Sequence, residues 1–311
     1  AQQSNVTAYG ATAVAIISLE AFAGMWINAF LVCVICTAWV KKKTLNSNEK
    51  ILLLLGCSRF WYLCLSWVYY FLSTIYPNYL YVHPTFQVTV FFQSFSACLT
   101  LWVSACLCVF YCIKIANFRN RFFIYLKVKI DRIVPWLLLG SVLSALAIGI
   151  TSCDIADKML INSHNYTRQG NFLKVSYKTD EYFFHIYFIY GFGFVTSFTA
   201  VIISALLLLF SLWRHKWKMQ KNSINSLSMD AHIKAMKSVL SFLVMYSINF
   251  IFLILSLIPS TKAEKYVAFL SLLFLNAFPS FHSLILILSN PKLENTLIRI
   301  LSCIKCKVCM K

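Results

Sequence analysis

Charged residues are scarce in this sequence. They make up only 12% of its 311 residues, whereas hydrophobic residues make up 60%. Soluble domains usually contain about 25% charged residues. A water-soluble chain of this length could not hide so much apolar side-chain area. The scarcity of charge therefore excludes an ordinary soluble domain and indicates a protein that crosses a membrane several times.

Acidic residues are especially few: 10 against 28 basic residues, which gives a net charge of +18. The basic residues gather in clusters that lie between or after apolar runs. A surface that binds DNA would not be divided in this way, so nucleic-acid binding is disfavoured. The pattern is typical of cytoplasmic loops beside anionic lipid headgroups. The main clusters are Lys41–Lys50, Lys114–Arg132, Arg214–Lys237 and Lys292–Lys311.

Seven stretches contain the roughly 20 mainly apolar residues that a helix needs to cross a bilayer. They predict an all-α membrane protein with a seven-transmembrane helix bundle. Because basic clusters follow the first, third, fifth and seventh stretches, we expect the N-terminus outside and the C-terminus inside. The predicted spans are Ala11–Val40, Ile51–Ile75, Thr85–Ile113, Ile133–Ser152, Phe183–Trp213, Val239–Ile258 and Tyr266–Leu288.

This topology divides the chain into an extracellular N-terminus (1–10), a membrane domain (11–288) with an outer loop (153–182), and a cytoplasmic tail (289–311). The first ten residues lack the basic start of a secretory signal, so we expect the first span to direct insertion. Two glycosylation sequons, at Asn5 and Asn165, fall on the outer side. Their positions agree with the predicted orientation.

The sequence contains 12 cysteines, most of them inside apolar runs, where cysteine behaves as a small hydrophobic residue. Only Cys153 lies near the outer side, which disfavours an extracellular disulfide. Cys303, Cys306 and Cys309 lie among lysines beside the last span, and this setting favours palmitoylation. Zinc binding and unmodified thiols stay open as alternatives for these three residues, and no cofactor is expected.

Two charged residues, Glu20 and Arg59, lie inside predicted spans, where a charge costs at least about 2.5–3.5 kcal/mol. If the first two helices are antiparallel neighbours, Arg59 and Asn28 meet at similar depth. Ser280 and His282 in span seven complete a polar cluster with them. This cluster either fixes helix register or acts as a conformational switch. Glu20 lies two turns further outward and reaches Arg59 only along a long diagonal.

His282 and Ser283 invite a reading as base and nucleophile. Adjacent residues on a helix point in different directions, however, and no acidic partner is evident. We therefore expect no enzymatic activity.

Seven predicted spans with an outer N-terminus are typical of G-protein-coupled receptors. The sequence at the junction after span three distinguishes between two classes of these receptors. The Asp-Arg-Tyr motif of rhodopsin-like receptors is absent, as are their Cys-Trp-x-Pro and Asn-Pro-x-x-Tyr motifs in spans six and seven. Instead, FYCIKIANF (Phe110–Phe118) and FIYLK (Phe123–Lys127) stand at this junction. They resemble the signature of the bitter taste (type 2 taste) receptor family of G-protein-coupled receptors.

The resemblance extends along nearly the whole chain. Span one has Glu20, Gly24 and Asn28 at the family's spacing, and span two has its Ser-Arg pair at Ser58 and Arg59. Three further segments are similar to the family: Leu207–Gln220, Asp230–Tyr246 and Pro279–Asn295. The chain departs from the family at Ser197, where many members have proline, and at Gln93 and Ala97, where many have tryptophan and asparagine.

The resemblance implies a chemosensory receptor in the plasma membrane that detects small, often hydrophobic bitter compounds and activates a heterotrimeric G protein such as gustducin. The expected ligand-binding residues are Tyr70, Gln93, Ala97, Tyr187, Tyr190, Phe194, Tyr246, Asn249, Ser271 and Leu272. The expected G-protein contacts are Tyr111, Lys114, Asn117, Lys127, His215, Lys218, His232 and Lys237.

Two alternatives stay open at this point. A vomeronasal type 1-like pheromone receptor has a related organisation, although the ordered motifs disfavour it. A membrane transporter or channel requires a hydrophilic path, whereas the predicted spans contain hardly any charged residues besides Glu20 and Arg59. The sequence also lacks the internal repeats of many transporters.

Overall fold

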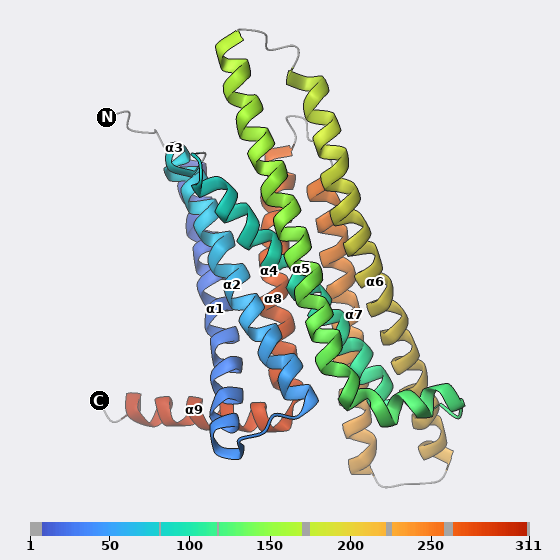
Figure 1. Cartoon of the computed structure of the whole chain (residues 1–311). Helices are drawn as coiled ribbons and strands as arrows, with labels where there is room; N and C mark the ends of the chain where they lie inside the picture. Colours follow the sequence, from blue (N-terminus) through green and yellow to red (C-terminus); the bar gives the residue numbers. More distant parts are fainter. Residues whose placement is uncertain are drawn as a thin grey trace.

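The structure is a computed structural model that describes residues 8–80, 82–116, 118–169, 175–221, 226–257 and 264–309. Within these ranges, all the regular elements are helices (Figure 1). The elements are α1 (Ala8–Lys42), α2 (Ser47–Ile75), α3 (Pro77–Leu80), α4 (Thr85–Ile115), α5 (Arg121–Gln169), α6 (Val175–Lys221), α7 (Ser226–Leu257), α8 (Glu264–Ser289) and α9 (Pro291–Cys309).

The seven predicted spans correspond to α1, α2 and α4–α8, which confirms the predicted helical bundle. Six of these helices have described segments that are long and apolar enough to cross a membrane, and α7 has a shorter described apolar segment, Val239–Phe252. Helices suit these segments because a helix pairs its backbone polar groups internally, which lipid cannot do for them.

Two regions contain more helix than the sequence criterion predicts. Most of the predicted outer loop 153–182 is helical, because α5 continues to Gln169 and α6 begins at Val175. The tail forms α9, which lies across the bundle axis at the end of α8 (Figure 1). Hydropathy identifies only the part of a helix that lies in lipid, so it does not detect polar extensions or a helix that lies along the surface.

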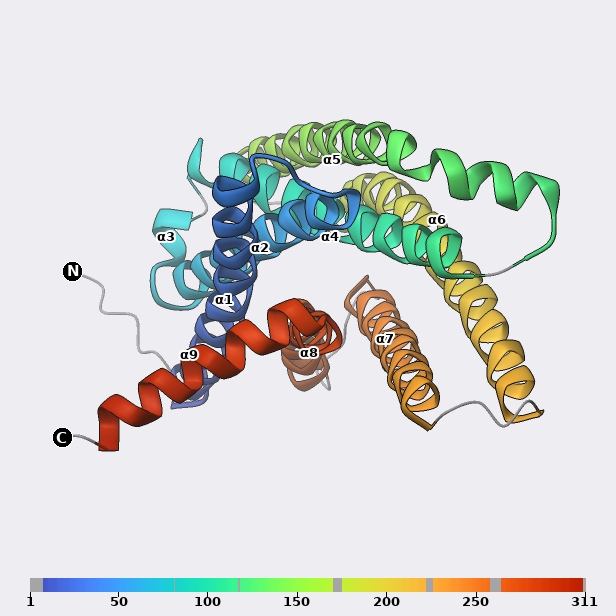
Figure 2. The ribbon, with the colours of Figure 1, turned by 90° about the horizontal axis from the view of Figure 1, so that it is seen from below.

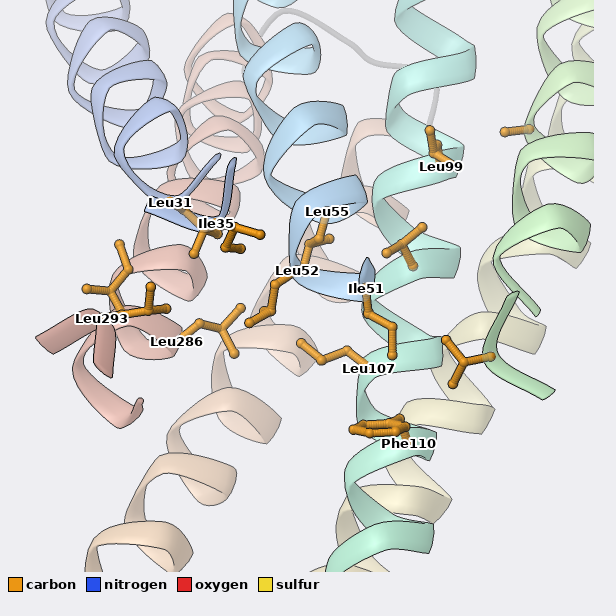
Figure 3. Packing of buried hydrophobic residues seen from close by; sticks show 14 of the residues in the cluster. Leu31, Ile35, Ile51, Leu52, Leu55, Leu99, Leu107, Phe110, Leu286 and Leu293 are labelled. Atoms are coloured by element: carbon orange, nitrogen blue, oxygen red, sulfur yellow. The ribbon is translucent and has the colours of Figure 1, made fainter. Parts of the chain in front are cut away.

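The bundle has its centre at α4. The apolar segment of α4 is 61% buried, against 22% for α5, and α4 runs through the middle of the view along the bundle (Figure 2). The largest apolar cluster joins α1, α2, α4, α5, α8 and the start of α9. Its members include Leu31, Ile51, Leu55, Leu107 and Leu286 (Figure 3).

The two ends of the bundle differ, and we name them by their chain segments. The end at which α1 begins is the N side, and the end that carries α9 is the α9 side (Figure 1). On the α9 side, Lys292 Nζ donates to Glu49 Oε1 at 2.9 Å, and Glu49 also caps the start of α2 by accepting from the Asn46 amide at 3.1 Å. Leu293 is buried in the main apolar cluster. These contacts hold α9 against α1 and α2.

Candidate functional site

A buried polar layer crosses the middle of the bundle around Arg59, which is fully buried. Its Nη1 donates to Ser283 Oγ at 2.8 Å, and its Nη2 donates to Ser104 Oγ at 3.0 Å. Nη2 also contacts His282 Nδ1. Ser283 Oγ in turn donates to Asn28 Oδ1 at 2.7 Å. One guanidinium therefore links α1, α2, α4 and α8.

The contact with Arg59 determines the tautomer and the charge of the His282 ring. Since the guanidinium only donates, Nδ1 of His282 must accept, and the proton of the neutral ring lies on Nε2. A protonated ring would place a second positive charge against Arg59 in a buried site. His282 is itself only 2% exposed. The layer therefore contains one buried charge whose two Nη groups meet neutral oxygen and nitrogen acceptors, while its Nε has no hydrogen-bond partner among the described residues.

An aromatic cluster lies against this layer and joins α7 to α8. The His282 ring lies 4.3 Å from Phe242 and 5.6 Å from Phe278, measured between centroids. Tyr246 packs edge-on to Phe278 at 5.5 Å. The Arg59 Cζ atom is 6.0 Å from the centroid of the Phe278 ring, a distance at which a cation–π attraction operates.

A small cavity of about 50 Å³ lies on the N side of this layer. We call it the N-side cavity. Three of the residues expected to bind ligand, Ala97, Phe194 and Asn249, come together in its wall. Ligand pockets usually enclose about 300–1,000 Å³, so the helices must separate before this cavity can hold a whole organic ligand. The full lining is Tyr62, Ala97, Thr100, Leu101, Phe194, Asn249, Leu275, Phe278 and Pro279.

A larger cavity of about 340 Å³ lies on the α9 side of the layer. We call it the α9-side cavity. Its wall is mostly apolar, with Tyr111, His282 and Asn290 among its few polar groups. It reaches the corner between α8 and α9 at Pro291. The remaining lining residues are Leu107, Cys108, Ile115, Leu208, Val239, Phe242, Ile285, Leu286 and Ser289.

Comparison with known sequences identifies the class of protein to which these features belong. The family model described as Taste receptor protein (TAS2R) matches residues 6–305. The chain belongs to the taste receptor type 2 family. It is a multi-pass membrane protein, a G-protein-coupled chemosensory receptor of the bitter taste class, and not an enzyme.

Individual relatives cover nearly the whole chain. Taste receptor type 2 member 2 of Homo sapiens is 30% identical over 297 residues, which are 94% of this chain and 95% of the relative. Taste receptor type 2 member 109 of Mus musculus is 32% identical over 301 residues, 94% of this chain and 93% of the relative. Taste receptor type 2 member 102 of Rattus norvegicus is 32% identical over 299 residues, which are 94% of this chain and 88% of the relative. The pheromone-receptor and transporter alternatives are not favoured.

The other expected ligand residues of this taste receptor whose side chains are described are not part of the N-side cavity wall. Tyr246 packs in the aromatic cluster and is only 1% exposed. Ser271 is buried on α8, and the helix positions Tyr70, Gln93 and Leu272 are half-buried. Tyr187 and Tyr190 lie on α6, but their side chains are outside the described part of the structure.

The expected G-protein contacts divide in a similar way. Tyr111 lines the α9-side cavity, whereas Lys114 forms an ion pair with Asp131 of α5 at 2.7 Å. Helix geometry explains this difference, because a step of three residues turns the side chain about 60° back, so that Ile115, four residues on, shares the cavity wall with Tyr111. Lys127 Nζ donates to the backbone oxygen of Ala116 at 3.2 Å.

His215, another expected G-protein contact, is exposed on α6. The other expected residues lie outside the part of the chain whose side chains are described. Asn5 and Asn117 lie outside the described residues. The side chains of Lys218, His232, Lys237, Asn165, Cys303, Cys306 and Cys309 lie outside them as well, although their helices are described. The nine cysteines whose side chains are described are all free thiols.

The polar layer contains residues that the sequence did not single out for it. Ser283, rather than the expected Ser280, bridges Arg59 and Asn28. Ser280 also faces α1, at Gly24, but it lies about one helical turn further toward the N side. Ser104 was not anticipated at all. A signal for it exists in the sequence, since Ala97, Thr100 and Ser104 recur at steps of three and four residues and mark the inner face of α4.

Proposed function

We propose that this receptor detects small, often hydrophobic bitter compounds at the N-side cavity and activates a heterotrimeric G protein, such as gustducin, at the α9-side cavity. The observation that carries the proposal is the arrangement of two cavities on opposite sides of one buried polar and aromatic layer. Both cavities draw their walls from α4, α6, α7 and α8. The same helices therefore meet both partners.

The charge distribution supports a plasma-membrane receptor with its N-terminus outside. Lys41 and Lys42 end α1, and Lys114 ends α4, all on the α9 side. Arg121 begins α5 on that side, and Lys292 is the second residue of α9. By the positive-inside rule this end faces the cytoplasm, where a G protein binds, and the N side faces arriving ligands.

Coupling between the two cavities follows from their shared residues. Phe278 lines the N-side cavity, and His282, one helical turn further along α8, lines the α9-side cavity. Both rings contact Arg59. A ligand that widens the N-side cavity displaces Phe278 and thereby changes the packing of His282 and Phe242. It activates the receptor if it binds the widened arrangement more tightly than the contracted one.

The α9-side cavity suits an amphipathic helix of the G protein. Helix-in-groove recognition places apolar side chains of one helix into an apolar groove of another protein. Leu107, Leu208 and Val239 supply such a groove from three different helices. Tyr111 and Asn290 supply polar groups at its wall, and these fix the orientation of the bound helix.

Calcium mobilisation tests the ligand half of the proposal. A panel of bitter compounds is screened in cells that express the receptor with a promiscuous Gα subunit, and Asn249→Ala is then compared with Gln93→Ala. Of these two residues, Asn249 lines the N-side cavity and Gln93 does not. We therefore expect Asn249→Ala to raise the half-maximal agonist concentration by about tenfold, which corresponds to a loss of about 1.4 kcal/mol in binding free energy. Gln93→Ala should have less effect. Unchanged responses of Asn249→Ala to every active compound, at equal surface expression, would exclude this cavity.

A further inference from the structure

A second group of polar side chains lies on the N side of the layer around Arg59, and several of their buried atoms lack hydrogen-bond partners among the described residues. We call it the Glu20 layer; it consists of Glu20, Ser66, Asn276 and Ser280. Within the described part of the chain, Glu20 Oε2, the hydroxyls of Ser66 and Ser280, and both polar side-chain atoms of Asn276 are buried without hydrogen-bond partners. Asn276 is 1% exposed, Ser66 2% and Ser280 8%, whereas the Glu20 side chain is half-buried.

Helix register places these residues at neighbouring levels of the bundle. A methyl group at Gly24 of α1 would overlap Ser280 Oγ of α8 and would lie 2.7 Å from Leu63 Cδ1 of α2. These three positions therefore define the level at which α1, α2 and α8 meet. We then move one helical turn toward the N side on each helix. This is four residues back from Gly24 on α1, four back from Ser280 on α8, and three forward from Leu63 on α2, which runs in the opposite direction. Those positions are Glu20, Asn276 and Ser66.

Tyr62 of α2 provides an independent link between two members of the layer. Its hydroxyl lies beside Ser66 and interacts electrostatically with Glu20. The Ser66 hydroxyl nevertheless lacks a partner with hydrogen-bond geometry among the described residues. Glu20 and Ser66 thus face the same part of the interior, where Glu20 forms no ion pair with a described residue. The guanidinium of Arg59 is instead bonded to Ser104 and Ser283.

Buried polar atoms without partners are costly and demand an explanation, and a carboxylate is the most costly of them. Here the unpaired acceptors are one carboxylate oxygen, two hydroxyl oxygens and one amide oxygen. Such oxygen ligands suit hard cations. A single carboxylate balances one positive charge, and Arg59, about two turns away on α2, would repel a second charge. We propose that the Glu20 layer binds a monovalent cation of the size of Na⁺.

The position of the layer gives such a cation a structural consequence. Phe278 and Pro279, which line the N-side cavity, lie on α8 between Asn276 and Ser280. A cation held by Glu20 on α1 and by Asn276 and Ser280 on α8 would fix this part of α8 against α1. The proposed site is distinct from both cavities, and its occupation does not depend on the proposed ligand or G protein.

Thermal unfolding of the purified full-length receptor in lipid nanodiscs tests the site directly. Unfolding is measured near neutral pH in NaCl and in N-methyl-D-glucamine chloride at the same ionic strength. We expect Na⁺ to raise the Tm of the wild type in a saturable manner, by roughly 2–5 °C, because a ligand that binds only the folded state stabilises it. Glu20→Gln should abolish the Na⁺ effect, whereas the control Glu294→Gln on α9 should retain it.

Two further variants keep the proposal testable if Glu20→Gln fails to fold. Ser66→Ala removes one oxygen and should raise the Na⁺ concentration needed for half of the Tm shift by several-fold. Asn276→Asp adds a second carboxylate and should lower that concentration and make the receptor respond to Ca²⁺. An equal wild-type Tm in both salts, or a full Na⁺ shift in Glu20→Gln, overturns the proposal. A Tm that follows pH but not Na⁺ also overturns it, because it indicates a protonated Glu20 paired with water.

Discussion

The two cavities of this receptor have walls from the same helices but differ in size, about 50 Å³ on the N side and about 340 Å³ on the α9 side. Stacked aromatic rings join α6 to α7 and α7 to α8. Phe198 stacks on Phe250 with centroids 3.9 Å apart, and Phe252 stacks on Phe274 at 4.1 Å. The comparison teaches that the bundle is closed where we propose that ligands enter and open where we propose that the G protein binds.

The layer around Arg59 divides the two cavities, and its removal should have the largest effect. Arg59→Ala leaves Ser104, Ser283 and His282 without their buried partner. We expect a loss of about 1–3 kcal/mol in stability, the cost of leaving a buried polar group without its hydrogen-bond partner. Thermal unfolding and surface expression measure this loss. The matched control is Arg121→Ala, which removes an exposed arginine at the start of α5; equal effects of both changes would contradict the assignment of Arg59.

Filling the α9-side cavity should separate ligand binding from signalling. Val239 lines this cavity, whereas its neighbour Leu240 is 52% exposed on the outer surface of α7. We expect Val239→Trp to reduce G-protein activation at least tenfold without a comparable loss of ligand affinity, because the indole occupies the groove. Leu240→Trp is the control and should signal normally. The assignment of this cavity fails if both variants signal alike at equal expression.

Filling the N-side cavity should have the opposite effect. Ala97 lies in its wall, and a leucine there takes up space that a ligand needs. For Ala97→Leu we expect half-maximal agonist concentrations to rise by about tenfold, equivalent to about 1.4 kcal/mol. Activation at saturating agonist should remain near that of the wild type. Dose–response curves at matched surface expression measure both quantities, and a reduced maximum with unchanged potency would indicate a role in coupling instead.

The ion pair that holds α9 should have the smallest effect. Lys292 and Glu49 are joined at 2.9 Å, but the lysine side chain is 48% exposed. Exposed pairs usually contribute about 0.2–1 kcal/mol. We expect Glu49→Lys and Lys292→Glu each to lower the Tm slightly and to weaken G-protein coupling less than Val239→Trp does. The double exchange should restore part of both losses; a double variant that behaves as the sum of the two single variants would show that the pair does not matter.

The sequence predicts the spans well because length and hydropathy are sufficient to recognise a helix in lipid. The approach of Arg59 to Asn28 also follows from depth alone in two antiparallel helices. Helix rotation does not follow in this way. The pairing of Lys114 with Asp131 depends on how α4 is rotated against α5. The choice of Ser283 over Ser280 as bridge depends on how far α8 is shifted along α1 and α2. Long-range packing sets these rotations and shifts, and the local sequence does not encode them.

The volume of a cavity is even harder to predict from sequence than helix rotation. Ala97, Phe194 and Asn249 are recognisable as candidates, but the small volume between them depends on how α2, α4, α6, α7 and α8 pack together in space. Phe242 and Phe278 are apolar residues in apolar runs, and nothing in their local sequence marks them as the partition between two cavities. The arrangement around His282 becomes visible only when α7 and α8 are packed together.

Ligand-dependent nucleotide exchange on a purified heterotrimeric G protein is the most direct test of the central claim. The receptor is reconstituted in nanodiscs with a compound that is active in cells, and the Val239→Trp variant is measured in parallel. The two-cavity account predicts that the compound accelerates exchange with the wild type and that Val239→Trp binds the compound but does not accelerate exchange. Exchange that is independent of the compound, or that is undiminished in Val239→Trp, would contradict the account.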